Sequence, residues 1–207
     1  MLDGAARVGD LMSEVKAQGM PAIAMTDHGN VFGAFEFYKA AKKADVKPII
    51  GIEAYVAPES RFDKKRVQWA DGGEDDVSGG GAYTHMTILA ENNEGLGNLF
   101  RLSSLASLEG YYYKPRMDRE LLATYSKGLI ATTGCPGGEI QTRLRMGAYK
   151  EAIKAASAYR DIFGKENFFL EVMDHGIEIE ARVKADLMKL GKELGLPLLA
   201  TNDLHYT

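Results

Sequence analysis

The histidines of this chain all lie in or directly after short apolar runs of the kind that form β-strands; they are His28, His85, His175 and His205. The single cysteine, Cys135, follows another such run, and Glu53 lies inside one, where an unpaired carboxylate is costly to bury. Imidazole, carboxylate and thiolate ligands together suit zinc, manganese or iron better than magnesium or calcium. Their types and positions therefore predict a site for such metals.

Two or three metals held by these groups would form a hydrolytic site, because they lower the pKa of a water molecule, orient a phosphate and stabilise the entering and leaving oxygens. Other interpretations exist for each residue alone. A histidine at a strand end is usually structural, Cys135 alone would be a small buried apolar residue, and the glutamate could pair with a lysine. All four histidines are associated with strands, and Asp-His pairs at 27–28 and 174–175 and an Asp-x-His pair at 203–205 accompany them, which favours the metal site.

Helical periodicity alternates with short apolar runs along the chain. The sequence predicts helices over residues 6–18, 31–44, 95–108, 119–125, 139–163 (interrupted near Gly147) and 179–194. It predicts strands over residues 22–25, 48–56, 84–90, 129–133, 168–173 and 197–201. Strands joined through helices indicate a parallel sheet covered by helices, either a barrel or a doubly wound sheet. The carboxyl ends of such strands meet on one face, where one site could collect these side chains; His85, near the start of its strand, fits least well.

The composition is that of an ordinary globular protein, with 45% apolar and 26% charged residues and a net charge of −4. We expect residues 1–207 to form one domain. No apolar run approaches the roughly 18 residues of a membrane span, residues 1–10 lack the pattern of a signal peptide, and one cysteine excludes an internal disulfide. These features predict a cytoplasmic protein with no membrane partner. Residues 57–82, rich in charge and glycine, are predicted to form an exposed, mobile insertion.

Seven runs of the sequence carry a family resemblance: LDGAA, AMTDHGN, PIIGIEAYV, HMTILAEN, GYYYKPR, TTGCPGGEI and LLATNDLHY. They resemble the polymerase-and-histidinol-phosphatase (PHP) domain, in the form carried by alpha subunits of the bacterial replicative DNA polymerase III, especially those of actinobacteria. The resemblance extends over essentially the whole chain. It implies an α/β fold, a distorted seven-stranded β/α (TIM-like) barrel with its metal site at the carboxyl ends of the strands.

The resemblance also implies roles for individual residues. The metal ligands of the family fall on Asp3, His28, Glu53, His85, Cys135, Asp203 and His205. Asp203, His205 and His28 are then the expected catalytic residues, and two or three divalent metals, zinc or manganese before iron, the expected cofactors. The family's leading His-x-His precedes the Asp-Gly that aligns with Asp3 and Gly4, and this sequence does not contain it. We therefore expect a fragment of a larger polymerase that lacks the first barrel strand and is impaired when isolated.

The function implied by the resemblance is a metal-dependent 3′–5′ proofreading exonuclease that acts on the primer 3′ end within a DNA-directed DNA polymerase. The expected partners are DNA, the remainder of the alpha subunit, and the sliding clamp and other replisome subunits through the full-length protein. Two alternatives stay open. The domain could be a non-catalytic structural or interaction module of the polymerase, or a free-standing phosphoesterase of the histidinol-phosphatase type.

A segment with three aromatic rings and two cations, Tyr111 to Arg116, follows a predicted helix. Such a combination is typical of single-stranded DNA binding, because rings stack on bases and cations contact phosphates. We therefore expect Tyr113, Lys114 and Arg116 to contact the substrate, together with His175. The alternative is that the tyrosines belong to the core and the cations are solvated.

Overall fold

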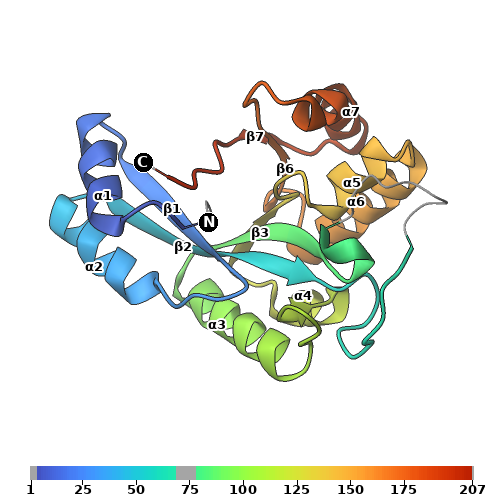
Figure 1. The fold of residues 1–207 in the computed structure, drawn as a ribbon, viewed down its shortest axis with the longest axis horizontal. Coiled ribbons are helices and arrows are strands. Elements are labelled where there is room, and N and C mark those ends of the chain that lie inside the picture. Colours follow the sequence, from blue (N-terminus) through green and yellow to red (C-terminus); the bar gives the residue numbers. More distant parts are fainter. Residues whose placement is uncertain (1–3, 69–77, 207) are drawn as a thin grey trace.

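A computed structural model describes residues 4–68 and 78–206 of the chain. Its strands form one curled sheet that resembles half of a barrel, in the order β1-β2-β3-β5-β6-β7 with β4 beside β2 (Figure 1). The strands are β1 (Ala22–His28), β2 (Lys47–Val56), β3 (Thr84–Ala90), β4 (Arg116–Met117), β5 (Leu129–Thr132), β6 (Phe168–Val172) and β7 (Leu198–Ala200). Within the described residues, β1 pairs only with β2 and β7 only with β6, so the half-barrel has two open edges.

The sheet is mixed, which corrects the prediction of a parallel one. Strand β3 runs antiparallel to both β2 and β5, whereas the other pairings are parallel. The physical reason is the connection from β2 to β3. A parallel return needs a crossover, usually a helix, and no α-helix lies between these strands in the described part. The chain instead returns beside β2, so that Val56 pairs with Thr84.

The helices cover the outer face of the half-barrel. They are α1 (Val8–Ala17), α2 (Ala34–Ala44), α3 (Asn93–Leu108), α4 (Arg119–Tyr125), α5 (Glu139–Arg145), α6 (Tyr149–Phe163) and α7 (Glu178–Leu194). Helices α1 and α2 lie at one end of the sheet and α5, α6 and α7 at the other (Figure 1). None of the described helices is long and apolar enough to span a membrane.

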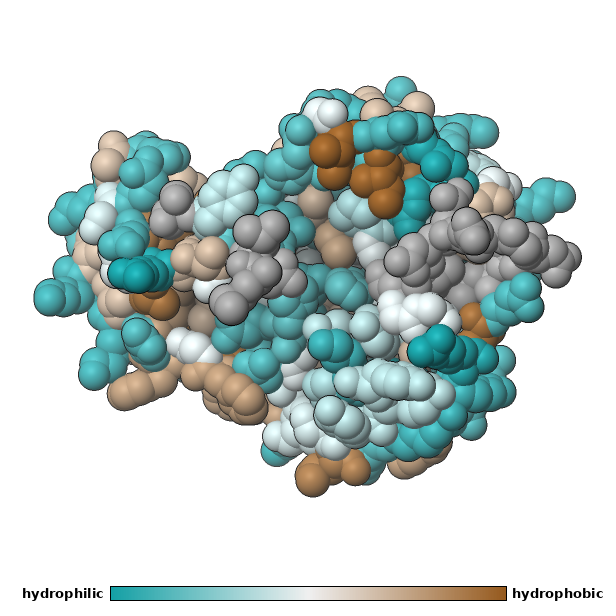
Figure 2. All heavy atoms as spheres, viewed as in Figure 1, coloured by the Kyte–Doolittle hydropathy of each residue, from teal (hydrophilic) through white to brown (hydrophobic). Residues whose placement is uncertain are grey.

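Two apolar clusters fix these layers. The smaller one joins α1 and α2: Met12 and Val15, three positions apart on one face of α1, pack in the same cluster as Phe37 of α2. The larger one lies between the sheet and the remaining helices, where Ile88 and Leu102 are fully buried. Figure 2 shows the opposite face of the sheet as a hollow between two lobes. The apolar side chains of the sheet thus pack outward against the helices. The polar residues at the strand ends remain on the open side of the half-barrel.

The segment predicted to be an exposed insertion is partly packed against the domain. Ala57, Arg61 and Ala82 are buried. The guanidinium group of Arg61 donates hydrogen bonds to Glu109 at 2.6 Å and to Asp118 at 3.1 Å. The expectation of exposure is therefore wrong for these residues, because paired carboxylates compensate the buried charge. Residues 69–77 of the predicted insertion lie outside the described residues.

Candidate metal centre

His28, Glu53 and His85 come together although they belong to three different strands. His28 is the last residue of β1 and is the register partner of Glu53 on β2. One ligand atom from each of the three residues lies within 4.8 Å of the other two. Nδ1 of His85 lies 2.5 Å from Oε1 of Glu53, and Nδ1 of His28 lies 3.6 Å from Oε2 of the same carboxylate. The three side chains form a compact group of two imidazoles and one carboxylate.

His85 reaches this group because β3 runs antiparallel to β2. The register pairs His85 with Tyr55, two residues beyond Glu53. The first residues of β3 therefore lie beside the carboxyl end of β2, where a parallel strand would have placed its last residues. This direction explains how a histidine near the start of its strand joins residues at the ends of theirs.

The turn after β1 holds His28 in place. Asn30 donates a hydrogen bond from its side-chain amide to the carbonyl of His28 at 2.9 Å and accepts one from the backbone N–H of Phe32 at 2.9 Å. Gly29 has a φ of 70°, and a Cβ atom there would lie 2.8 Å from the ring of Tyr55. The run His-Gly-Asn is thus a local requirement of the turn that orients the imidazole.

Cys135 joins the group from the turn after β5. Its Sγ atom lies 3.5 Å from Oε1 of Glu53 and 3.5 Å from Nδ1 of His85. Gly134 has a φ of 74°, and Gly138 donates its N–H to the carbonyl of Cys135 at 2.8 Å. A backbone bridge between His85 and Gly138 joins this turn to β3. The glycines of Thr-Gly-Cys-Pro-Gly-Gly therefore shape a turn that brings the thiol to the other ligands.

The electrostatics of the group favour an ionised carboxylate. Burial alone would raise the pKa of Glu53, but the hydrogen bond with His85 and the charge of His28 leave this pKa below its ordinary value. Burial raises the pKa of the Cys135 thiol, and the nearby charge of Glu53 raises it further. The group therefore contains an ionised carboxylate beside a neutral thiol. A cation that entered the group would favour loss of the thiol proton.

Asp203 and His205 approach the same group from the segment after β7. The ring of His205 lies 6.3 Å from the ring of His28, measured between centroids. The backbone carbonyl of His205 accepts a hydrogen bond from Ala6 at 3.1 Å, so this segment crosses the open side of the half-barrel toward α1 (Figure 1). Burial raises the pKa of Asp203, and the charge of Glu53 raises it further. Asp203 and His205 thus lie close to the group formed by His28 and Glu53.

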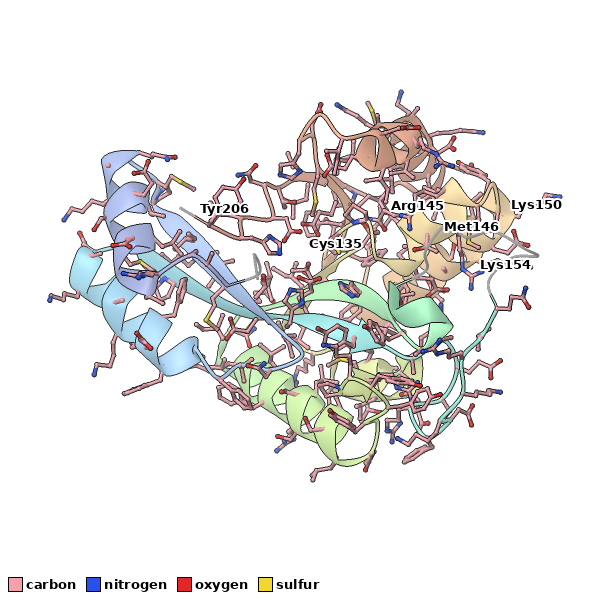
Figure 3. The ribbon with its side chains drawn as sticks, viewed as in Figure 1. Cys135, Arg145, Met146, Lys150, Lys154 and Tyr206 are labelled. Carbon is pink, nitrogen blue, oxygen red and sulfur yellow. The ribbon has the colours of Figure 1, made fainter. Side chains whose placement is uncertain are left out.

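The side-chain view confirms the central position of these segments. Figure 3 shows Cys135 near the middle of the half-barrel and Tyr206 on the segment that crosses its open side, whereas Lys150 and Lys154 lie at the far right edge. Asp3, the remaining expected ligand, lies outside the described residues.

His175 lies near Asp203 but is held by a different set of atoms. Its Nδ1 atom lies 2.7 Å from Oε1 of Glu180, and its Nε2 atom lies 2.8 Å from the carbonyl oxygen of Asn202. The backbone N–H of His175 also donates to Glu180, at 2.7 Å. Because both ring nitrogens face acceptors, both carry protons in this arrangement. Sequence reasoning missed Glu180, a buried carboxylate in the first turn of α7.

Arg116 does not lie on the predicted substrate surface. Its side chain is fully buried and donates hydrogen bonds to the backbone carbonyls of Gly110, Ala82, Arg61 and Asp63 at 2.8 to 3.2 Å. A guanidinium group carries five N–H donors in a fixed plane, so it can donate hydrogen bonds to several carbonyls of irregular backbone at once. The expectation that Arg116 contacts substrate is therefore wrong; it holds the 57–68 segment to the domain.

Lys114 and Tyr113, by contrast, are exposed. Nζ of Lys114 lies 5.5 Å from the ring centroid of Tyr55, and that ring stacks on His28 at 6.1 Å. Tyr113 is 58% exposed, and its ring centroid lies 5.1 Å from the guanidinium carbon of Arg66. Lys114 thus contacts the aromatic ring that borders the imidazole of β1.

Two tyrosines that sequence reasoning missed pack against the imidazoles. Tyr55 stacks on His28, and Tyr83 stacks on His85 with a centroid distance of 5.8 Å. The two tyrosine rings meet edge to face at 4.9 Å. A signal was available, because residues two apart on a strand face the same side: Tyr55 follows Glu53 by two, and Tyr83 precedes His85 by two.

The model of the PHP domain family matches residues 1–175 of the chain. The chain belongs to the PHP domain family. This PHP domain is 63% identical over 215 residues to the DNA polymerase III subunit alpha of Saccharopolyspora erythraea and 58% identical over 209 residues to that of Mycobacterium tuberculosis. Each alignment covers 100% of this chain but only 18% of the relative. The PHP domain therefore spans less than a fifth of these polymerase subunits.

Solved structures share the fold of this PHP domain. A protein from Bifidobacterium adolescentis described as a metal-dependent phosphoesterase gives a TM-score of 0.59 at 14% identity, over 98% of this chain and 84% of that one. An amidohydrolase from Chromobacterium violaceum, with bound sulfate and no metal, gives 0.57 at 15% identity over 99% and 84%. At these identities the likeness concerns the fold alone.

The donor set of this PHP domain fits a metal centre. The carboxylate of Glu53, the imidazole of His85 and the thiol of Cys135 lie within hydrogen-bond distance of one another. The imidazole of His28 lies 3.6 Å from the same carboxylate, and that of His205 lies beside His28. In such sites nitrogen, oxygen and sulfur ligands select zinc, manganese or iron. Buried polar groups that contact one another in this way can exchange their mutual hydrogen bonds for bonds to a cation.

Proposed function

We propose that this PHP domain is a metal-dependent phosphodiesterase that removes mispaired nucleotides from the 3′ end of a DNA primer, within an alpha subunit of DNA polymerase III. The observation that carries the proposal is the convergence of His28, Glu53, His85 and Cys135 from separate strands and turns. The similarity to polymerase subunits over the whole chain supports DNA as the substrate class.

The proposed ligands of two or three divalent metals are Asp3, His28, Glu53, His85, Cys135, Asp203 and His205. Zinc or manganese fits this set best, and iron also fits. When bound, such metals lower the pKa of a water molecule and neutralise charge on the phosphate. Among these residues, His28, Asp203 and His205 are proposed to contact the reacting phosphate through the metals they hold.

The chain's other residues are proposed to bind and orient the substrate. Lys114 offers an exposed ammonium beside the ring of Tyr55, and Tyr113 an exposed ring on which a base can stack. His175, fixed by Glu180, offers a cation on the side of the hollow that Asp203 lines. These groups would hold a single-stranded 3′ end across the hollow from two sides.

Several features of the whole protein are part of the same proposal. The partners would be the primer–template DNA, the rest of the alpha subunit, and the sliding clamp and other replisome proteins in the cytoplasm. A further strand that carries His-x-His would pair with the open edges of β1 and β7. Together with the six strands of the path β1-β2-β3-β5-β6-β7, and with β4 outside that path, it would complete a seven-stranded barrel around the hollow. The support for this strand is that both edges border the candidate metal centre.

The test uses the full-length product of the gene that encodes this chain. Asp203→Asn removes one carboxylate charge from the centre, and we expect exonuclease activity on a mispaired primer to fall by more than about 100-fold while polymerisation is retained. Asp174→Asn is the matched control, because Asp174 also follows a strand but pairs with Lys184 at the surface. Unchanged primer degradation by Asp203→Asn would contradict the proposal.

The same experiment separates the alternatives. Parent protein that binds metal but degrades no primer would indicate a structural module. Parent protein that hydrolyses small phosphomonoesters in preference to primer ends would indicate a phosphatase of the histidinol-phosphatase type.

A further inference from the structure

Glu171 is a buried carboxylate whose role differs from that of the other buried acids. It lies on β6 and is 6% exposed. Its Oε1 atom accepts a hydrogen bond from the hydroxyl of Thr201 at 2.5 Å, and its Oε2 atom accepts one from the hydroxyl of Thr132. These hydroxyls lie on or next to β7 and β5, so one carboxylate connects three neighbouring strands.

The hydrogen bonds of Glu171 to Thr132 and to Thr201 are the two arms of this connection, and each arm leads to a candidate metal ligand. Gly134, the residue before Cys135, donates its N–H to the hydroxyl oxygen of Thr132 at 3.1 Å. Thr201 precedes Asp203 by two residues, at the start of the segment that also carries His205. The backbone N–H of Glu171 donates to the hydroxyl of Thr133 at 2.9 Å, which ties β6 to the Cys135 turn a second time.

The other buried acids of the described chain each have a basic partner. Glu53 pairs with His85, Asp118 with Arg61, Glu139 with Arg119 and Arg143, and Glu180 with His175. No salt bridge joins Glu171 to a described basic residue; its contacts are hydroxyl and amide groups. Packing alone does not account for a carboxyl group at this position, since burying such a group without a basic partner costs free energy.

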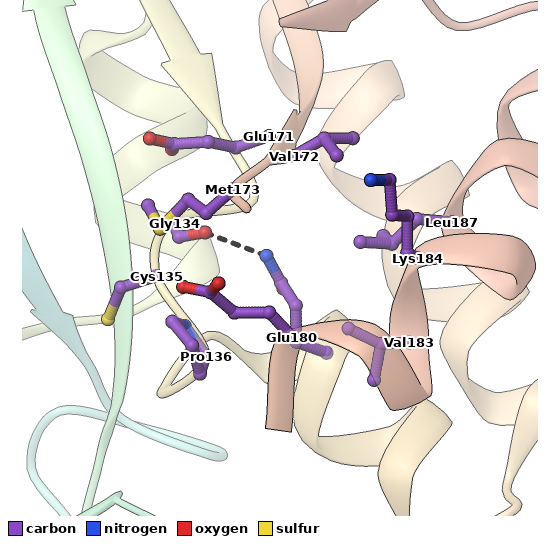
Figure 4. Close-up of a pocket in the computed structure, with 11 residues that line it drawn as sticks. Gly134, Cys135, Pro136, Glu171, Val172, Met173, Glu180, Val183, Lys184 and Leu187 are labelled. Atoms are coloured by element: carbon purple, nitrogen blue, oxygen red, sulfur yellow. Dashed lines mark hydrogen bonds between the residues drawn. The ribbon is translucent and has the colours of Figure 1, made fainter. Parts of the chain in front are cut away.

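Figure 4 shows where this carboxylate lies. Glu171, Cys135 and Glu180 line one small pocket between the Cys135 turn, β6 and α7. The pocket is lined on its far side by Val183 and Leu187 of α7. Glu171 and Cys135 therefore border the same pocket, one from β6 and the other from the turn after β5.

We propose that Glu171 is a positioning residue that holds the Cys135 turn and the Asp203–His205 segment at the spacing that metal binding requires. The inference rests on the proposed metal-dependent function. The carboxylate acts through the two threonine hydroxyls: one arm fixes the turn of β5, and the other fixes the beginning of the segment after β7. A single group thereby sets the distance between ligands that lie about 70 positions apart in the sequence.

The test measures metal binding of the full-length protein by calorimetry with Mn²⁺ and by the thiolate–cobalt absorption band with Co²⁺. We expect Glu171→Leu to weaken Mn²⁺ binding by at least about 10-fold, the size of effects from groups that orient ligands. Glu171→Gln keeps the length and an acceptor oxygen, so its Mn²⁺ affinity should stay within about 3-fold of the parent. The control is Glu139→Gln, an equally buried glutamate whose carboxylate pairs with Arg119 and Arg143 and not with strand hydroxyls, and it should leave Mn²⁺ affinity unchanged.

The two arms are tested separately. Thr132→Val should reduce the thiolate–cobalt band, because it releases the turn of Cys135. Thr201→Val should weaken Mn²⁺ binding and leave that band nearly unchanged. If the role of Glu171 were purely structural, Glu171→Leu would lower the urea midpoint of unfolding and the metal affinity together. Leucine in place of a buried carboxyl group without a basic partner can instead leave stability unchanged or raise it, so we expect metal affinity to fall without a matching fall in the urea midpoint.

The outcomes decide between the two proposals. A parent protein that binds neither Mn²⁺ nor Co²⁺ overturns the metal site and this inference with it. A parent that binds metal, with a folded Glu171→Leu variant of equal affinity, overturns only the role of Glu171. If Glu171→Leu does not fold, Thr201→Val decides, and its unchanged affinity overturns the proposal. Loss in Glu171→Gln as large as in Glu171→Leu would make Glu171 a ligand and contradict positioning.

Discussion

Lys114 and Arg116, two residues apart in one short segment, lie in opposite environments. Lys114 is exposed, with its ammonium group 5.5 Å from the ring of Tyr55. Arg116 is fully buried and binds four backbone carbonyls. The difference follows from the short strand β4, because Arg116 is the register partner of Tyr55 on β2 whereas Lys114 precedes this strand. The two cations should therefore have separable roles.

We expect Arg116→Ala to lower the free energy of unfolding by about 3 kcal/mol or more, because it leaves several buried carbonyls without donors. Lys114→Ala should change it by less than about 0.5 kcal/mol, as is usual for surface substitutions. Urea unfolding followed by circular dichroism measures both values. Equal losses in the two variants would contradict the difference in role.

Lys114→Ala should instead weaken binding of single-stranded DNA and reduce the salt dependence of that binding. Loss of one phosphate contact lowers the slope of log K against log salt by about 0.7 for a single strand. Fluorescence anisotropy of a labelled oligonucleotide at several salt concentrations gives the slope. Lys42→Ala, an exposed lysine on α2, is the control, and it should retain the parent slope. If both variants keep the parent slope, Lys114 does not contact phosphate.

Much of the framework follows from sequence periodicity. The helices over 119–125 and within 139–163, and the strand over 84–90, are confirmed with the same or nearly the same bounds. The direction of β3 was not predictable in this way, because strand direction depends on the connection and the apolar pattern of a strand reads alike in both directions. The same limit explains why His85 looked misplaced in the sequence.

The candidate ligands were predictable from residue type, but the groups around them were not. His28, Glu53, His85 and Cys135 are rare or costly residues at strand positions, and the structure brings them together. Glu171, inside the apolar strand Phe168–Val172, carries the same signal of a costly carboxylate as Glu53, but sequence reasoning missed it. Its significance appears only when the hydroxyls on both neighbouring strands are seen to meet it.

His175 should remain protonated at higher pH than an ordinary histidine. Its hydrogen bond with Glu180, together with the carbonyl of Asn202, raises the pKa of its ring above 6.5. Because the folded-state pKa is raised, this contact stabilises the fold fully below about pH 6.5, and the stabilisation is lost as the pH rises through the folded-state pKa. Titration of the ring signals by NMR should show the raised midpoint, and Glu180→Gln should lower it. An identical midpoint in Glu180→Gln would show that the carboxylate is not its cause.

Tyr159 should make the protein less stable at alkaline pH through a single proton. Its ring is fully buried, and its hydroxyl donates to Glu139 at 2.8 Å. Burial raises the pKa of Tyr159 well above 10, and the charge of Glu139 raises it further, although Arg119 acts in the opposite direction. Above about pH 10 the unfolded chain therefore loses this proton while the folded chain keeps it, so stability falls with rising pH by up to about 1.4 kcal/mol per pH unit.

Tyr159→Phe should be less stable than the parent by about 1 kcal/mol near pH 8, because it lacks the hydrogen bond. It should approach the stability of the parent above pH 10, because it lacks the titrating group. Urea midpoints measured from pH 8 to 11 give the difference between the two proteins; a difference that stays constant over this range would show that Tyr159 keeps an ordinary pKa in the fold.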